Sequence, residues 1–169
     1  MKLHFYPLFL LAIASATLHA EFLVEITSAS GDFSGRGKRY VYTSETAVIE
    51  VFRYLDNSIT VTIDDLPGQT PNWWTLDIAA PNESEIKSGF YENVGRIPLQ
   101  GRAQPGLLFS DSSGRYCSDL SGWFEVYSVT YDEAGGIEFL DMAFEQHCVG
   151  YSASHHGKIS FDATRRPEE

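Results

Sequence analysis

The chain is a succession of short segments in which apolar and polar residues alternate, and this pattern constrains its fold more than any other feature. The segments are rich in Val, Ile, Thr, Tyr and Phe, the residues that favour strands. Successive side chains of a strand point to opposite faces, so each segment can bury one face of a sheet. The segments span residues 22–27, 39–43, 47–54, 58–64, 73–79, 89–92, 107–110, 122–131, 137–146 and 158–161.

Turn signals separate these segments. Asp56 and Asn57 lie between two alternating runs, and residues 132–136 end in a pair of glycines that can adopt positive φ angles. Both sites predict hairpins. No stretch shows a convincing helical period, so we expect an all-β fold. The most consistent architecture is a single antiparallel β-sandwich of about eight to ten strands, with a β-barrel as the alternative.

The first 20 residues have the pattern of a secretory signal peptide. Lys2 precedes an apolar run over residues 5–16, and Ala20 supplies the small residue before a cleavage point. The run is too short for a membrane span, which needs about 20 apolar residues. We therefore expect a signal peptide over 1–20, a folded domain over 21–163 and a flexible tail over 164–169. The protein should be secreted or periplasmic, without a membrane span.

Cysteine usage agrees with export. The chain has two cysteines, Cys117 and Cys148, and both follow the leader. In an oxidising compartment an even number of cysteines predicts a disulfide. The bond would close a loop of about 31 residues and stabilise the protein by roughly 3–4 kcal/mol. A thiol nucleophile or a metal ligand is the alternative interpretation.

The charge balance excludes two classes of partner. Lys and Arg number 12 against 23 Asp and Glu, which gives a net charge of -11. Nucleic acids and anionic membrane surfaces both attract net positive charge, so we expect neither as a partner. With 43% hydrophobic residues, the chain also lacks the composition of a disordered protein.

Three motifs in the second half of the chain are distinctive. They are GR-x-C at 114–117, G-x-F-x-V at 122–126 and F-x-QHC at 144–148, and an SGDFSGRG stretch lies earlier at 30–37. On these motifs the chain resembles an uncharacterised family of secreted bacterial β-rich proteins and domains, over roughly residues 26–161. The resemblance implies an exported β-rich module. It implies no activity and supplies no catalytic residues.

Aromatic residues recur along the segment at 122–131. Trp123, Tyr127 and Tyr131 fall on alternate positions with Glu125 between the first two, so a regular strand would place all four on one face. If that face is open, the rings form a flat platform suited to sugar rings or to a protein partner. If the sheet is covered on both sides, the same residues belong to the core.

Histidines near the C-terminus suggest a second type of site. His147, His155 and His156 would meet at one end of a sheet if a turn separates the first from the other two. With a carboxylate such as Asp141 or Glu145 they would then bind zinc. The alternative is a set of solvated histidines at a hairpin end.

These observations favour an exported, non-catalytic binding or interaction module without a cofactor. The first ligand class is carbohydrate or cell-surface glycan, bound on Trp123, Glu125, Tyr127 and Tyr131. One alternative is a protein-interaction module, such as an inhibitor or an envelope-assembly factor that contacts an extracellular protein. The other is a small metal-dependent hydrolase that uses the three histidines.

Overall fold

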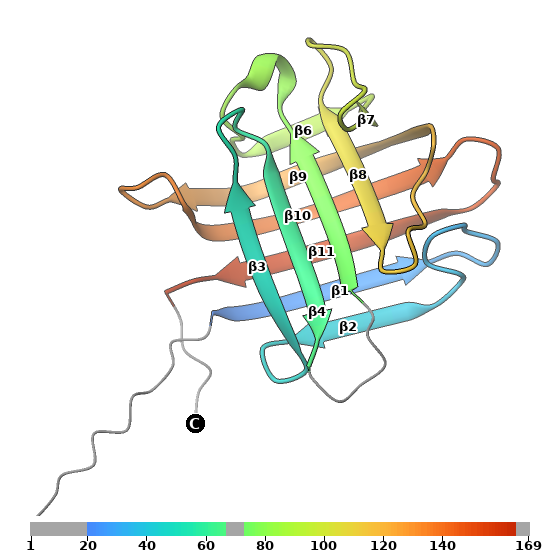
Figure 1. Ribbon diagram of the computed structural model, residues 1–169, viewed down its shortest axis with the longest axis horizontal. Coiled ribbons are helices and arrows are strands. Elements are labelled where there is room, and N and C mark those ends of the chain that lie inside the picture. The colour runs from blue at the N-terminus through green and yellow to red at the C-terminus, as the bar shows by residue number, and fades with distance from the viewer. Residues whose placement is uncertain (1–19, 67–72, 165–169) are drawn as a thin grey trace, which may run out of the picture.

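The computed structural model describes residues 20–66 and 73–164 and shows two β-sheets packed face to face. The strands of one sheet run across those of the other, and the sheets do not close into a barrel (Figure 1). The expected β-sandwich is therefore confirmed and the barrel alternative is excluded. The expected signal peptide and C-terminal tail fall almost wholly outside the described residues. Within the described part of the chain, no helix is long and apolar enough to cross a membrane.

The larger sheet has six strands, all antiparallel to their neighbours. In spatial order they are β2 (Arg39–Thr43), β1 (Glu21–Ser28), β11 (Ser154–Asp162), β10 (Ile137–Cys148), β9 (Leu120–Tyr131) and β6 (Gly89–Glu92). The turn at residues 132–136 joins β9 to β10, as the glycine pair predicts.

The smaller sheet has five strands. In spatial order they are β3 (Ala47–Arg53), β4 (Ile59–Asp65), β5 (Trp73–Ala79), β8 (Gly106–Asp111) and β7 (Gly95–Arg96). The pair β3–β4 is the hairpin expected around Asp56 and Asn57, whereas β7 runs parallel to β8. A single 3-10 turn, Pro81–Glu83, follows β5. The two-residue strand β7 is too short for a sequence pattern, so the described residues form eleven strands rather than eight to ten.

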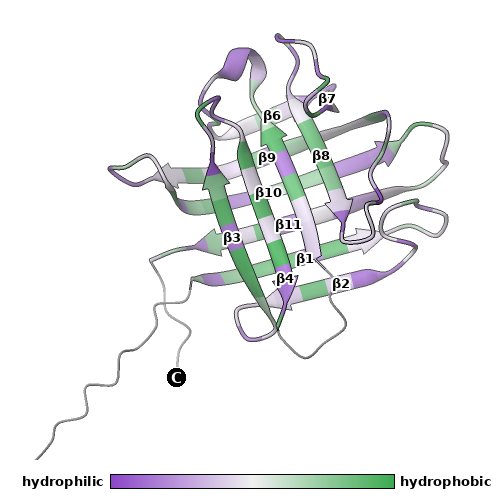
Figure 2. Cartoon of the chain, in the orientation of Figure 1, coloured by the Kyte–Doolittle hydropathy of each residue, from purple (hydrophilic) through white to green (hydrophobic). Residues whose placement is uncertain are grey.

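The core lies between the sheets and follows from the alternation. On β1 the side chains of Val24 and Ile26 are fully buried, while Leu23 and Glu25 face the other way. Figure 2 shows hydrophobic and hydrophilic residues alternating along many strands. Burying a large aliphatic or aromatic side chain contributes about 1.5–3 kcal/mol, so this interface dominates stability.

A chain of aromatic rings connects the two sheets through the core. Trp74 of β5 stacks on Phe109 of β8 with ring centroids 5.0 Å apart, and Phe109 packs against Phe144 of β10 at 5.2 Å. The buried indole N–H of Trp74 donates to the hydroxyl of Tyr42 on β2 at 2.8 Å. The only polar atom of this large ring therefore has a hydrogen-bond partner, as buried polar atoms in proteins normally do.

The predicted disulfide is confirmed. Cys117, in the connection from β8 to β9, is bonded to Cys148 at the end of β10, with Cα atoms 5.0 Å apart. Both residues are buried. The bond ties the β8–β9 connection of the chain to the six-stranded sheet.

Candidate functional site

The candidate binding surface lies on the outer face of the six-stranded sheet. On β9, Phe124 and Val126 point into the core and are almost completely buried. Trp123 and Glu125 therefore point outward, because neighbouring residues of a strand alternate. No strand of the described residues covers this face, since the five-stranded sheet packs on the other side.

A second ring lies beside Trp123. Phe90 of the neighbouring strand β6 is 55% exposed, and its ring centroid lies 5.4 Å from that of Trp123 with the planes inclined by 32°. Phe90 stands directly opposite Glu125, and Glu92 stands opposite Trp123. We call Phe90, Trp123, Glu125 and Tyr127 the outer aromatic patch. The alternation in Gly89–Glu92 signals a strand, but only the pairing of β6 with β9 reveals that Phe90 belongs to this surface.

A β-bulge at Tyr127 changes the second half of β9. Val126 pairs with Met142, but Ser128 pairs with Asp141, so Tyr127 is an extra residue with no partner of its own on β10. Such an insertion reverses the alternation beyond it. Tyr127 itself remains on the surface, half exposed.

Tyr131 consequently faces the core, not the platform. Its hydroxyl donates to the carbonyl of Ile86 at 2.7 Å, and the guanidinium carbon of Arg53, on the opposite sheet, lies 4.6 Å from its ring centroid. Burial and the charge of Glu85 raise the pKa of Tyr131 to about 12, although Arg53 acts to lower it. The expectation that Trp123, Tyr127 and Tyr131 share one face is therefore wrong for Tyr131.

Carboxylates surround the outer aromatic patch. Loss of solvent raises the pKa of the Tyr127 hydroxyl, as do the charge of Glu125, a hydrogen bond with Glu125 and the charge of Asp141. On β10, Glu145 stands opposite Trp123, and its Oε2 lies 3.3 Å from Nδ1 of His156 on β11. The face thus offers the exposed rings of Phe90 and Tyr127 and the partly buried ring of Trp123, together with several hydrogen-bond acceptors.

The three histidines do not converge. The strand β11 begins at Ser154, so His155 and His156 are adjacent strand residues that point to opposite faces. His155 is completely buried, whereas His156 is exposed on the outer face, where His147 also points. In the described residues, no group of three or more His, Cys, Asp or Glu side chains is placed to hold a metal ion. The expected zinc site at His147, His155 and His156 is therefore wrong.

His155 instead belongs to a buried polar cluster beneath the SGDFSGRG stretch. Its Nδ1 lies 3.2 Å from Oδ1 of Asp32, and both side chains are completely buried. The other Asp32 oxygen accepts the N–H of Gly35 at 2.5 Å and the hydroxyl of Ser28 at 2.8 Å. Burial acts to raise the pKa of Asp32, but the interactions with His155 and the hydrogen bonds from Gly35 and Ser28 outweigh it and hold the pKa below its ordinary value of 3.8. This cluster anchors the loop between β1 and β2.

The GR-x-C motif has a structural role. Asp111 is buried at the end of β8, and its carboxylate accepts the N–H and hydroxyl of Ser113 and the N–H of Arg115. The Arg115 guanidinium completes the arrangement with an ion pair to the same carboxylate. The turn that leads to Cys117 is therefore organised around one buried acid.

The F-x-QHC motif also has a structural role. Gln146 is completely buried and bonds both backbone groups of Phe109 on the opposite sheet, at 2.7 and 3.1 Å. His147 points outward, and Cys148 forms the disulfide. Both motifs stabilise one end of the sandwich, and neither assembles a nucleophile with a base.

Comparison of the chain with family models, with curated proteins and with solved structures finds no match. The resemblance to secreted bacterial β-rich proteins therefore rests on the motifs alone.

Proposed function

We propose that the protein is an exported, non-catalytic binding module that takes a carbohydrate on the outer aromatic patch. One observation carries the proposal. The rings of Phe90 and Trp123 lie side by side on an open sheet face, with Glu92 and Glu125 directly opposite them on the paired strand.

The chemistry of this surface suits a sugar. Aromatic rings pack against the apolar C–H faces of sugar rings, and each ring adds about 1–2 kcal/mol at roughly 25 cal/mol per Å² of buried apolar area. Carboxylate oxygens accept hydrogen bonds from sugar hydroxyls. Glu125 lies between Trp123 and Tyr127 on β9 and is placed to do so.

Export is supported by the leader pattern and by the disulfide. Residues 1–20 have the three-part organisation of a signal peptide. The bond between Cys117 and Cys148 is of a kind that persists in oxidising compartments. The ligand would then be a glycan of the cell surface or the surrounding medium.

The test is a titration of the purified protein with soluble oligosaccharides, for example cellohexaose, xylohexaose and chitohexaose, monitored by tryptophan fluorescence. We expect at least one of them to change the emission, and Trp123→Ala to abolish the change and weaken binding measured by calorimetry. The matched control is Trp73→Ala, because Trp73 is 41% exposed but lies on the other sheet.

Equal weakening by both substitutions would place the ligand elsewhere. Absence of binding by every sugar tested in this panel and in a wider glycan array would argue for the protein-interaction alternative.

A further inference from the structure

The strand β3 forms an open edge of the five-stranded sheet. It pairs along its whole length with β4, from Ala47 opposite Asp65 to Arg53 opposite Ile59. On its other side no strand of the described residues pairs with it, and Figure 1 shows it at the margin of the sheet.

Among the described residues, the backbone of this edge has hydrogen-bonding groups that no strand pairs with. The N–H of Tyr54 donates to the carbonyl of Ser58 at 2.9 Å, which makes these two residues a hydrogen-bonded pair of the hairpin. Hydrogen-bonded and non-hydrogen-bonded pairs alternate along an antiparallel ladder. The N–H and C=O groups of Ile49 and Val51 therefore point away from β4, toward the open edge.

The other edge strands of the two sheets are shorter than β3. β2 has five residues, β6 has four and β7 has two. Short length, Pro, Lys and bulges are the usual means of keeping an edge from pairing with another chain. β3 has seven residues, AVIEVFR, contains no Pro or Lys, and pairs with β4 in an unbroken register.

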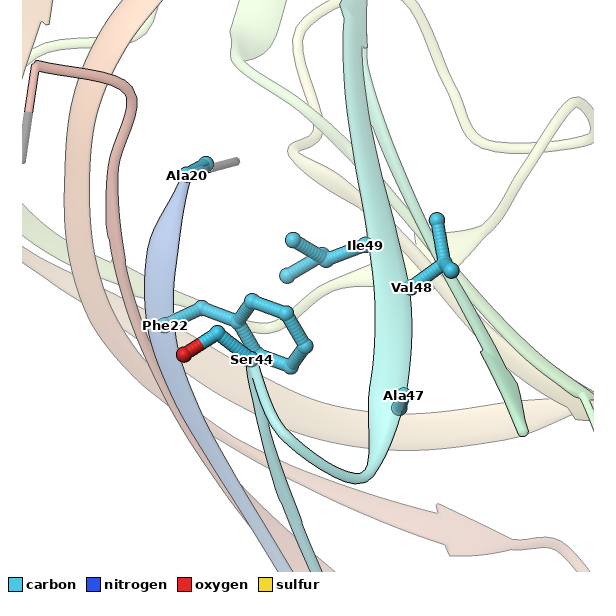
Figure 3. A pocket seen from close by; sticks show the side chains of 6 residues that line it. All are labelled: Ala20, Phe22, Ser44, Ala47, Val48 and Ile49. Carbon is cyan, nitrogen blue, oxygen red and sulfur yellow. The ribbon is translucent and has the colours of Figure 1, made fainter. Parts of the chain in front are cut away.

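Both faces of β3 present apolar surface. Val48 and Phe52 point outward and are 44% and 45% exposed. On the inner side, Phe22 of β1 and Ile49 of β3 project into a hollow of about 40 Å³ between the two sheets (Figure 3). An added strand would place its inward side chains over this hollow and its outward side chains beside Val48, Glu50 and Phe52.

The charge around the edge is negative. Glu50 lies between Val48 and Phe52 on the outer side, and Asp64 stands opposite Val48 on β4. The one cation of the strand, Arg53, is paired with Glu85 at 3.0 Å. A second copy paired symmetrically about Glu50 would bring two of these carboxylates face to face, and both copies carry a net charge of -11.

We propose that β3 is a docking edge for an extended, basic segment of another protein, which adds to the five-stranded sheet as a sixth strand. Backbone bonds to Ile49 and Val51 supply the pairing. Alternate apolar residues of the segment cover the open side of the core, and Lys or Arg faces Glu50.

The test is a fluorescence anisotropy titration of two fluorescein-labelled peptides of nine residues. In the Val–Lys peptide Val alternates with Lys, and in the Val–Glu peptide Val alternates with Glu. We expect the Val–Lys peptide to bind and the Val–Glu peptide not to bind. Glu50→Lys should weaken the Val–Lys peptide by about tenfold or more and allow the Val–Glu peptide to bind.

Two further variants separate strand addition from simple charge attraction. Val48→Lys should weaken the Val–Lys peptide, whereas its matched control Val41→Lys, at an equally exposed valine of β2, should not. Val51→Pro removes an N–H that points to the open edge but leaves the ladder to β4 intact, so binding should be lost with little change in Tm.

Binding of the Val–Lys peptide that survives both Val48→Lys and Val51→Pro would show attraction to an acidic protein without strand addition, and would overturn the proposal. A dimer in sedimentation velocity that Val48→Lys dissociates would also overturn it, because the occupant would then be a second copy.

Discussion

The side chain of Gln146 takes the place of a missing strand beside Phe109. Its Oε1 accepts the N–H of Phe109 at 2.7 Å, and its Nε2 donates to the carbonyl of the same residue at 3.1 Å. The short strand β7 pairs with β8 only at Gly106 and Leu107. Beyond β7, Gln146 bonds the N–H and C=O of Phe109, which would otherwise lack a partner strand. A residue of the six-stranded sheet thus closes the edge of the five-stranded sheet at β8. The edge at β3 has no such cover among the described residues.

Removing this amide should destabilise the protein strongly. Gln146→Ala deletes both hydrogen bonds to Phe109 and a third to Sγ of Cys117, and it leaves the buried N–H and C=O of Phe109 unsatisfied, so we expect a loss of about 2–4 kcal/mol. Urea unfolding of both proteins measures this. Gln104→Ala is the control, because Gln104 also bonds two backbone groups but at an exposed site, and it should cost less than about 1 kcal/mol. Equal losses for the two variants would contradict the role assigned to Gln146.

The bulge at Tyr127 predicts different behaviour for two residues of one strand. Tyr131→Ala should cost about 2–4 kcal/mol because its ring packs against the core, whereas Trp123→Ala should cost less than about 1 kcal/mol. Thermal unfolding by circular dichroism gives the comparison. Tyr131→Phe isolates the hydroxyl bond to Ile86 and should cost about 0.5–1.5 kcal/mol. If Trp123→Ala proves the more damaging, the reversal of faces along β9 is refuted.

The disulfide should be present in the exported protein and should contribute to its stability. A free-thiol assay on denatured, unreduced protein should detect no thiol, because Cys117 and Cys148 are bonded. Cys148→Ala should lower the free energy of unfolding by about 2–5 kcal/mol. The double variant lacking both cysteines controls for a stray thiol at Cys117. Two titratable thiols in the exported protein would disprove the bond.

Asp32 should make stability fall in acid. Its pKa lies below 3.8 in the folded protein, so its stabilising contribution is complete at neutral pH and is lost as pH falls from about 4 through the lowered pKa. The variant Asp32→Asn lacks this titration. The difference in unfolding free energy between the two proteins should therefore be largest above pH 5 and shrink toward pH 3. A difference that stays constant over this range would show that the carboxylate is not stabilised by its surroundings.

Much of the local structure could be predicted from the sequence. The ranges expected for β2, β5 and β6 coincide with the observed strands, and the turns at Asp56 and at residues 132–136 join hairpins. Alternation and turn residues act over a few positions, so a single chain is enough to reveal them. The exceptions are β7, which is too short for a pattern, and the first half of β11, because the polar residues Ser154–Gly157 show no apolar alternation and predict a loop.

The sequence by itself determined most of the strands, the sandwich class and, through two cysteines behind a leader pattern, the disulfide. Only the tertiary structure decided which faces are open. The bulge at Tyr127 turned Tyr131 inward, and pairing with β6 brought Phe90 beside Trp123. The start of β11 at Ser154 placed His155 on the inward face, where it meets Asp32. The physical reason is that alternation specifies two opposite faces, whereas register, bulges and contacts between distant segments decide what each face meets.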